Sequence, residues 1–433
     1  MTDPYEVRPL DKPPHCTVQV PGSKSITNRA LVLAALAQPQ DPSSDKHASI
    51  LNNALRSDDT EVMIDCLQRL GLAVMTDWSN NRIIVPCMPI TQWNKNVDFF
   101  CGNSGTTIRF LTAMLTVGTG TYRLDGVARM RERPIGHLID ALQLLGINIR
   151  CELDNQCPPV LLQAQTLPGG RLTVLGHISS QYLSALLMAA PYAQTSLSID
   201  VEGELVSVPY VNITLNMMRE WGITDLPSDG TRSQHVSYHF MPQHYRPRYY
   251  DIEPDASSAS YFWAVAAITG GTITVSGLSN SMQGDARFLQ SLITMGCQLV
   301  NEDTLRGDSL HGIDIDMNAI SDTVMTLAVV ALFAKGPTRI TNVAHIRHKE
   351  TDRLSALATE LRKVGAEVEE HPDGLTIHPH PLHGATLDTY DDHRMAMSLS
   401  LIGLKIPGIF IRNPGCVAKT FPSYWHTLEN LRQ

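Results

Sequence analysis

The sequence contains few cysteines, and they are not arranged in a functional pattern. Eight cysteines are scattered over 433 residues, without a C-x-x-C pair or a spacing typical of zinc ligands. The sixteen histidines include no H-E-x-x-H motif, which would mark a metal site on a helix. We therefore expect reduced thiols, and neither a disulfide framework nor a bound metal ion.

Long hydrophobic runs and an excess of positive charge are also missing. No apolar run reaches the roughly 18 residues that a membrane-spanning helix needs, and residues 1–6 lack the basic and apolar regions of a secretory signal. Lysine and arginine number 34 against 43 acidic residues, and the resulting net charge of −9 argues against a nucleic-acid-binding face. We expect a cytoplasmic protein that binds neither nucleic acid nor a membrane.

The catalytic motifs of several common enzyme classes are absent as well. The sequence has no G-x-S-x-G phrase, no P-loop and no G-x-G-x-x-G phrase. Their absence weakens the case for a hydrolase, a nucleotide hydrolase or a dinucleotide-dependent enzyme. We expect no cofactor.

What the sequence does contain is a recurring kind of helix start. Residues 21–29 and 102–109 combine glycine, hydroxyl residues and cations immediately before apolar helical runs. Similar starts lie at residues 179–181, 255–258, 321–322 and 391–394. Free backbone N–H groups and the positive end of the helix dipole gather at a helix start, and cations beside them make an anion site. The pattern predicts that the chain binds a small molecule rich in oxyanions.

A second pattern divides the chain into repeats. Amphipathic helical segments end at glycines that recur at intervals of 69 to 76 residues, namely Gly71, Gly146, Gly222, Gly296 and Gly365. A short β-type run follows each glycine, as expected where a helix ends and the chain turns back. Each interval also holds a nearly all-apolar helix, so we predict about six α/β units. At this length the units divide most simply into two lobes of three.

Cations and acids cluster where a functional site is more plausible than a solvent-exposed face. Lys24, Arg129, Lys349, Arg353 and Arg394 form the candidate cation set, whereas Arg131 and Arg133, each taken alone, are expected to be surface charges. Asp322 could be an ordinary helix N-cap or a functional carboxylate, and the sequence leaves both open. Glu350 follows Lys349 at a helix start, where both side chains can reach one cleft as an acid–base pair.

These phrases together resemble the 5-enolpyruvylshikimate-3-phosphate synthase family from residue 16 to residue 429. The phrases are PGSKSITNRALVLAALA, GNSGTTIRFLTAML, RMRERPIGHLIDAL, SSQYLSALLMAAP, DASSASYFWAVAAI, SMQGDARF, RHKETDRL, DDHRMAMSLSLIGL and AKTFPSYW. The resemblance implies an inside-out α/β barrel of two lobes, each with three βαβαββ units. Residues 21–249 would form the shikimate 3-phosphate lobe, and residues 1–20 with 250–433 the phosphoenolpyruvate lobe.

The resemblance also implies a reaction of the shikimate pathway: the enolpyruvyl group of phosphoenolpyruvate is transferred to the 5-hydroxyl of shikimate 3-phosphate by addition and elimination. It assigns phosphoenolpyruvate binding to Lys24, Gly105, Arg129, Arg353, Arg394 and Lys419. It assigns shikimate 3-phosphate binding to Lys24, Ser25, Arg29, Ser179, Ser180, Gln181, Ser207, Tyr210, Asp322 and Lys349. Asp322 is the expected base, and Lys24 and Glu350 are the expected proton donors. We expect the chain to act as a monomer on these two small molecules.

The sequence departs from the family pattern at two notable positions. His345 stands where Asn is usual, and Phe110 stands where Pro is common. Because proline would fix a first helical turn there, we expect Phe110 to weaken inhibition by glyphosate. Two other functions stay open. The related transferase acting on UDP-N-acetylglucosamine carries a reactive Cys where this chain has residues 127–129, and the chain could also be a catalytically silent binding protein.

Overall fold

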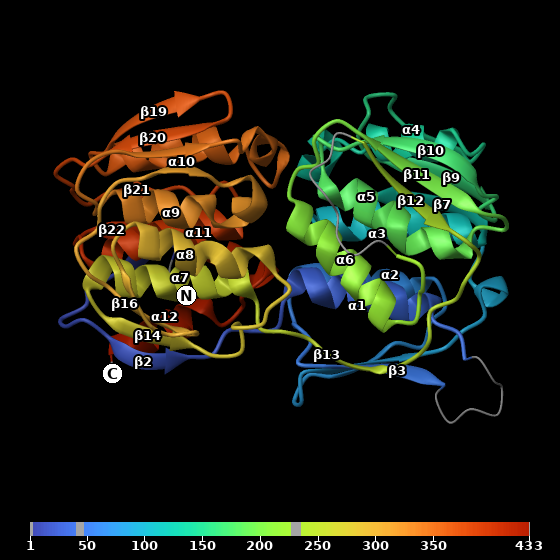
Figure 1. The fold of residues 1–433 in the computed structure, drawn as a ribbon, viewed down its shortest axis with the longest axis horizontal. Coiled ribbons are helices and arrows are strands. Elements are labelled where there is room, and N and C mark those ends of the chain that lie inside the picture. Colours follow the sequence, from blue (N-terminus) through green and yellow to red (C-terminus); the bar gives the residue numbers. More distant parts are fainter. Residues whose placement is uncertain (1–2, 40–46, 227–234, 433) are drawn as a thin grey trace. The chain divides into compact units, whose positions relative to one another are not determined.

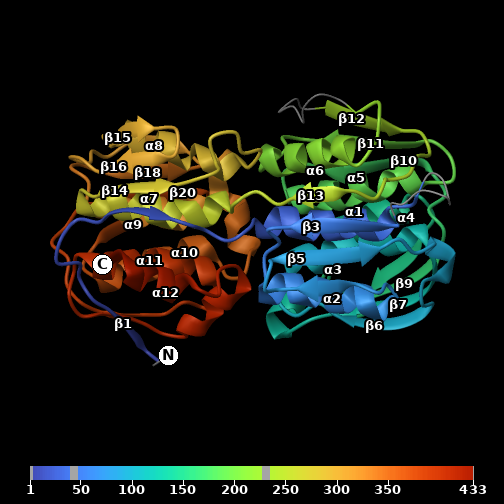
Figure 2. The same ribbon diagram turned by 90° about the horizontal axis from the view of Figure 1, so that it is seen from below.

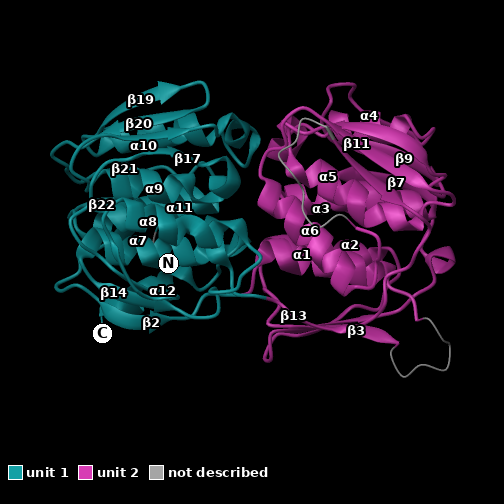
Figure 3. Cartoon of the chain, in the orientation of Figure 1, with its two compact units in different colours: residues 1–21, 253–433 teal, residues 22–252 magenta. Residues whose placement is uncertain are grey.

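The computed structural model describes residues 3–39, 47–226 and 235–432. The chain forms two compact units (Figure 3). Unit 1 contains Met1–Pro21 and Glu253–Gln433, and unit 2 contains Gly22–Ile252. Each unit is described separately below.

Unit 2 is built from alternating helices and short strands. Its helices are α1 (Lys24–Leu36), α2 (Asp58–Arg69), α3 (Gly105–Met114), α4 (Gly136–Gln143), α5 (Ser180–Ala189) and α6 (Val208–Glu220). Its strands are β3 (Ala48–Asn52), β4 (Met75–Asp77), β5 (Arg82–Pro86), β6 (Asn96–Phe100), β7 (Thr119–Asp125), β8 (Asn148–Cys151), β9 (Val160–Gln165), β10 (Gly170–Leu175), β11 (Leu197–Glu202), β12 (His235–Phe240) and β13 (Tyr249–Asp251). They form sheets of order β13-β3-β5-β4, β6-β7-β9-β8 and β10-β11-β12.

Unit 1 repeats this plan. Its helices are α7 (Ala256–Thr269), α8 (Phe288–Thr294), α9 (Val324–Ala331), α10 (Arg353–Lys363), α11 (His393–Ser400) and α12 (Tyr424–Glu429). Its strands are β1 (Tyr5–Val7), β2 (His15–Val18), β14 (Thr272–Val275), β15 (Gln298–Asn301), β16 (Thr304–Arg306), β17 (Asp314–Asp316), β18 (Thr338–Thr341), β19 (Glu367–His371), β20 (Gly374–His378), β21 (Thr386–Leu387) and β22 (Ile409–Ile411). They form sheets of order β15-β16-β14-β2, β17-β18-β20-β19 and β1-β22-β21.

Every sheet combines one parallel pair with antiparallel pairing. In unit 1, β2 runs parallel to β14, with His15 opposite Thr272; in unit 2, β13 runs parallel to β3, with Tyr249 opposite Ile50. Figure 1 labels both pairs, and Figure 2 shows β13 beside β3 from below; each pair joins segments far apart in the sequence. The shared pattern in all six sheets confirms the prediction of about six α/β units.

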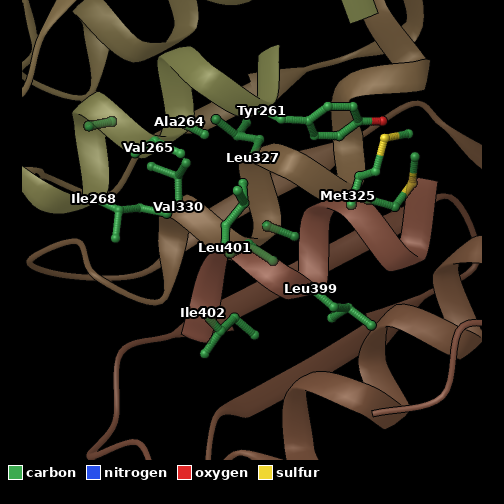
Figure 4. Packing of buried hydrophobic residues seen from close by; sticks show 14 of the residues in the cluster. Tyr261, Ala264, Val265, Ile268, Met325, Leu327, Val330, Leu399, Leu401 and Ile402 are labelled. Carbon is green, nitrogen blue, oxygen red and sulfur yellow. The ribbon is translucent and has the colours of Figure 1, made fainter. Parts of the chain in front are cut away.

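The apolar helices form the interior of each unit. Figure 1 shows helices stacked inside each unit with sheets on the outside. In unit 1, α7 and α11 both pack on α9, and Figure 4 shows side chains such as Val265, Val330 and Leu401 meeting there. In unit 2, α3 packs on α1 and α5. Helices without a polar face must be buried in this way to remove their apolar surface from water.

The glycines that define the repeat end helices as predicted. Gly71, Gly146, Gly222, Gly296 and Gly365 all have positive φ angles, between 76° and 116°. This region is open to glycine because it has no Cβ. No helix in the described part of the chain is long and apolar enough to cross a membrane.

Candidate active site

The first candidate anion site lies at the start of α1. Lys24 is the first residue of this helix, and its Nζ lies 3.3 Å from Oδ2 of Asp59 in the first turn of α2. Both side chains are largely buried. The backbone carbonyl of Ser25 accepts a hydrogen bond from Arg29, one turn later. Ser25 therefore lies beside a buried guanidinium, and Lys24 beside a buried carboxylate.

Arg29 links three helix segments of unit 2. Its Nε donates to Thr214 Oγ1 at 2.7 Å, its Nη2 donates to Ser184 Oγ at 3.2 Å and to the Tyr210 carbonyl at 3.1 Å, and its guanidinium lies 5.2 Å from the centre of the Phe110 ring. Among the described residues, its hydrogen bonds go only to hydroxyl and carbonyl oxygens. Burial lowers the pKa of Arg29 to about 10, because the low-dielectric interior disfavours the charged form.

The start of α3 is shaped by two further arginines. Gly105 is the first residue of α3. A Cβ at this position would lie 2.5 Å from Nη2 of Arg133 and 2.8 Å from Nη1 of Arg109. Both arginines are buried, and Arg133 donates to the carbonyl and side-chain oxygens of Asn103 at 3.0 and 3.1 Å. A Cβ at position 105 would therefore push these two guanidinium heads aside.

Arg109 also connects α3 to the start of α5. Its Nη1 lies 2.5 Å from Gln181 Oε1, and its Nη2 lies 3.0 Å from the carbonyl oxygen of Pro134. Gln181 also donates to Thr106 Oγ1 at 3.4 Å, and its backbone N–H donates to Ser179, the N-cap of α5. The structure thus brings the start of α3, which holds Gly105, close to residues 179–181 at the start of α5. The sequence analysis had assigned Gly105 to phosphoenolpyruvate and residues 179–181 to shikimate 3-phosphate.

Arg109 and Arg133 are functional candidates that the sequence analysis missed. Arg133 was expected at the surface, and that expectation is wrong, because its residue is only 2% exposed. Arg131 does lie at the surface, where it pairs with Asp125 at 2.6 Å. The available signal was the position of Arg109 four residues after Gly105, since residues four apart in a helix share a face.

The remaining candidates of unit 2 lie at helix starts and in one short 3-10 helix. Ser180 is the first residue of α5 and is buried. Ser207 adopts a left-handed conformation as the N-cap of α6, and Tyr210 lies in the first turn of that helix. Arg129 lies in the 3-10 helix η3 (Ala128–Glu132), where its Nη1 is 2.7 Å from Glu132 Oε2.

In unit 1, Arg353 is the centre of a network of acids. It is the first residue of α10 and its side chain is 1% exposed. Its guanidinium donates to three carboxylates: Asp392 at 2.8 Å, Asp322 at 3.0 Å and Glu350 at 2.9 Å. Burial by itself would lower the pKa of Arg353, but the negative charges of these acids raise it above its ordinary value.

Asp322 connects this network to the second arginine of unit 1. Its Oδ2 accepts from Arg394 Nη2 at 2.8 Å, while its Oδ1 accepts from Arg353. Asp322 lies in the 3-10 helix η6 (Asn318–Thr323) and does not cap α9, whose N-cap is Thr323. The N-cap position of α9 is therefore one residue later than Asp322. Arg394 itself is held at the start of α11 by Asp392, which accepts its backbone N–H.

Two lysines and a histidine complete this region. Lys419, at the end of the 3-10 helix η9 (Pro414–Lys419), lies 3.9 Å from Glu350 Oε1. Lys349 follows the 3-10 helix η7 (Ala344–His348), which contains His345. Burial, followed by the positive charge of Lys349, lowers the pKa of His345 to about 3. His345 is therefore a neutral side chain at physiological pH.

Asp285 is another acid that the sequence analysis did not select. It is buried next to α7, and its Oδ2 accepts a hydrogen bond from the hydroxyl of Ser257. Burial, followed by repulsion from Asp322, raises the pKa of Asp285 to about 7. Its signal was its place in the phrase SMQGDARF, in the 3-10 helix η5 (Gly284–Arg287).

The expected role of Phe110 rested on a wrong placement. Because α3 begins at Gly105, Phe110 lies in its second turn and not in its first. The ring is 1% exposed and lies under Arg29. A proline here would remove a helical hydrogen bond, so the argument from a first-turn proline does not hold for this chain.

With this geometry in place, the chain can be compared with known proteins. The sequence profile of EPSP synthase (3-phosphoshikimate 1-carboxyvinyltransferase) matches residues 11–428. The chain belongs to the EPSP synthase family. The prediction of the family is thereby confirmed, and with it the prediction of a transferase.

Individual relatives support the same assignment. The 3-phosphoshikimate 1-carboxyvinyltransferase of Trichormus variabilis is 45% identical over 429 residues, which cover 98% of each chain. The chloroplastic protein of the same name from Arabidopsis thaliana is 46% identical and covers 96% of this chain and 82% of its own. The structure of EPSP synthase from Acinetobacter baumannii superimposes with a TM-score of 0.79 at 22% identity, covering 99% of this chain and 98% of its own. This likeness confirms the predicted fold class of the EPSP synthase family.

Proposed function

We propose that this chain transfers the enolpyruvyl group of phosphoenolpyruvate to the 5-hydroxyl of shikimate 3-phosphate and releases phosphate. The observation that carries the proposal is the family match over residues 11–428, together with relatives named for this reaction that align along nearly the whole chain. The proposal draws on residues of both units. We further propose that the chain acts as a monomer in the cytoplasm.

In unit 2, the proposed role is to hold the phosphorylated acceptor. Lys24, Ser25 and Arg29 gather at the start of α1, and Ser179, Ser180, Gln181, Ser207 and Tyr210 gather at the starts of α5 and α6. Arg29 is surrounded by neutral acceptors, so its positive charge is not cancelled locally and attracts a phosphate strongly in the buried setting. Fixed donors of this kind orient the acceptor hydroxyl before the reaction.

For the donor, the proposed binding groups are Lys24, Gly105, Arg129, Arg353, Arg394 and Lys419. Guanidinium forks match the carboxylate and phosphate of phosphoenolpyruvate, and lysine supplies a compact charge. The backbone of Gly105, with no Cβ between it and two arginine heads, allows a close approach of the donor. These cations would stabilise the charge that develops on the departing phosphate.

The proposed chemistry has two steps. In the addition, the 5-hydroxyl oxygen bonds to the central carbon of the enol as Asp322 takes the hydroxyl proton, and Lys24 or Glu350 gives a proton to the methylene carbon. In the elimination, that methyl carbon returns a proton to the group that supplied one, and the carbon–oxygen bond to phosphate breaks with its electron pair going to the phosphate oxygen, which restores the double bond. Glu350, which lies between Arg353 and Lys419, is the second proposed proton carrier.

The test is a phosphate-release assay with phosphoenolpyruvate and shikimate 3-phosphate, in wild type and in Lys24→Met and Arg129→Ala. Because each 1.4 kcal/mol is tenfold in rate, losing one cation that binds the donor should lower kcat/KM by about 100-fold or more. Arg131→Ala is the matched control from the same short helix, since Arg131 pairs with Asp125, and it should stay within about threefold. Phosphate release with UDP-N-acetylglucosamine but not shikimate 3-phosphate would overturn the proposed acceptor. Release with neither would favour a silent binding protein.

A further inference from the structure

The two donor-site arginines of unit 1 are already occupied by one carboxylate. One carboxylate oxygen of Asp322 accepts a hydrogen bond from Arg353 Nη1 at 3.0 Å, and the other accepts one from Arg394 Nη2 at 2.8 Å. Its side chain is 15% exposed, against 1% for Arg353 and 6% for Arg394. The carboxylate is therefore the most accessible part of the group, and the arginines lie behind it.

The two arginines differ in what they would lose if Asp322 moved. Arg353 would keep Asp392 and Glu350, at 2.8 and 2.9 Å, and would remain neutralised. Arg394 receives its structural anchor through its backbone N–H, which Asp392 accepts. Its guanidinium fork can change partners without loosening the start of α11. Arg394 is thus the arginine suited to exchange one carboxylate for another, and Arg353 is suited to stay fixed.

We infer that Asp322 is an internal anion that competes with phosphoenolpyruvate for Arg394, and that binding of the donor displaces it. This inference rests on the proposed function, in which Arg394 binds the donor and Asp322 is the base. The donor carboxylate takes the place of Asp322 on the guanidinium fork, and the released carboxylate oxygen becomes available to the acceptor hydroxyl. No bond is formed or broken in this exchange. Asp322 would then occupy Arg394 while the donor site is empty, and would become free to act as the base once the donor binds.

The experiment is a titration of phosphoenolpyruvate alone into the full-length protein, followed by isothermal calorimetry, for wild type and Asp322→Asn. If Asp322 competes, its removal should tighten donor binding by about tenfold or more, in line with the worth of a close charge pair, although turnover is lost. In an Arg394→Ala background the same Asp322→Asn change should have an effect of about twofold or less, because the contested partner is gone. Asp388→Asn removes a charge that pairs with Lys363 and should leave donor binding unchanged.

Several outcomes would overturn the exchange. Asp322→Asn could bind phosphoenolpyruvate no more tightly than wild type, or the gain could persist in full in the Arg394→Ala background, which would make it a general charge effect. Absence of donor binding in both wild type and Asp322→Asn would also overturn it. Thermal unfolding of each variant confirms that the protein is folded. The proposed function fails separately, if wild type transfers nothing to shikimate 3-phosphate, because the exchange is judged from donor binding without acceptor.

Discussion

Two buried arginines, Arg29 in unit 2 and Arg353 in unit 1, have different kinds of hydrogen-bond partner. Arg29 in unit 2 donates to hydroxyls and carbonyls, and burial lowers its pKa to about 10. Arg353 in unit 1 donates to three carboxylates, which together outweigh burial and raise its pKa. Two equally buried guanidinium groups are therefore held by dipoles in one unit and by full charges in the other.

The difference indicates how each unit meets an anion. Arg29 lies among neutral acceptors and keeps its electric field, so a phosphate can bind beside it without displacing a carboxylate. In unit 1 the cations are already paired, so an incoming anion must replace a carboxylate or share an arginine with it. The neutral surroundings of Arg29 favour strong anion binding. The paired arginines of unit 1 couple anion binding to the release of a carboxylate.

The largest expected effect concerns stability. Arg353→Met removes a buried cation from three acids, and although Asp322 keeps Arg394 and Glu350 keeps Lys419, Asp392 loses its arginine. The change should lower the free energy of unfolding by about 3–5 kcal/mol. Arg29→Met should lower it by only about 1–2 kcal/mol, because Thr214 remains hydrogen-bonded to Ser184 at 3.0 Å. Urea unfolding followed by circular dichroism measures both. Equal losses would show that the two arginines are stabilised alike and would remove the contrast.

Local features of this chain could be predicted from the sequence. The helix ends at Gly71 and its repeats follow from glycine's access to positive φ, and the helix start at Asp255 follows from its cap, since its side chain accepts from the backbone N–H of Ser258. The six-unit plan also followed from these glycines, because their regular spacing is visible in the sequence. Which strands pair with one another is not visible there.

Partners distant in sequence could not be predicted. Arg353 meets Asp322 and Asp392, which lie 31 and 39 residues away, and no local pattern shows that three helix starts converge there. Arg133 looked like a surface charge because its neighbours are charged, yet it is buried against Asn103 and Gly105. A sequence motif can indicate which cations belong to a site. It cannot indicate which acids pair with them, because those pairs depend on tertiary packing.

A smaller effect should appear in the pH dependence of the free energy of unfolding, through Asp285 in unit 1. The folded state keeps the proton of Asp285 up to about pH 7, because burial and then repulsion from Asp322 raise the pKa of this carboxyl from its ordinary value of 3.8. Between these values the folded state binds more protons than the unfolded state, so the free energy of unfolding falls as pH rises. Asp285→Asn should remove this fall, and its stability relative to wild type should improve by roughly 1–3 kcal/mol from pH 4 to pH 8.

The control for this comparison is Asp314→Asn, which changes an exposed acid of the same unit. Its stability difference from wild type should not follow the Asp285 curve. Urea unfolding at a series of pH values measures all three proteins. A pH-independent difference between Asp285→Asn and wild type would mean that the Asp285 carboxyl is ionised in the folded state as readily as in the unfolded state.

The smallest expected effect is at His345, where the family usually has Asn. Because the pKa of His345 is about 3, the imidazole is neutral and offers one donor and one acceptor, as an amide side chain also can. His345→Asn should therefore change kcat/KM by less than about threefold, and neither protein should show a histidine titration of activity between pH 5.5 and 8. His345→Lys is the contrasting variant, because a second ammonium beside Lys349 should repel it and lower activity by about tenfold or more.

The pH dependence of stability at His345 has the opposite sign to that at Asp285. Below the ordinary value of 6.5, the unfolded state takes up a proton that the folded state refuses, so wild type should lose stability on acidification from pH 6.5 to 5, and His345→Asn should lose less. The contradicting result is a wild-type activity that changes with an apparent pKa near 6.5, with no such change in His345→Asn. It would show that His345 is charged during turnover, so that a neutral imidazole is not the reason why histidine can replace Asn here.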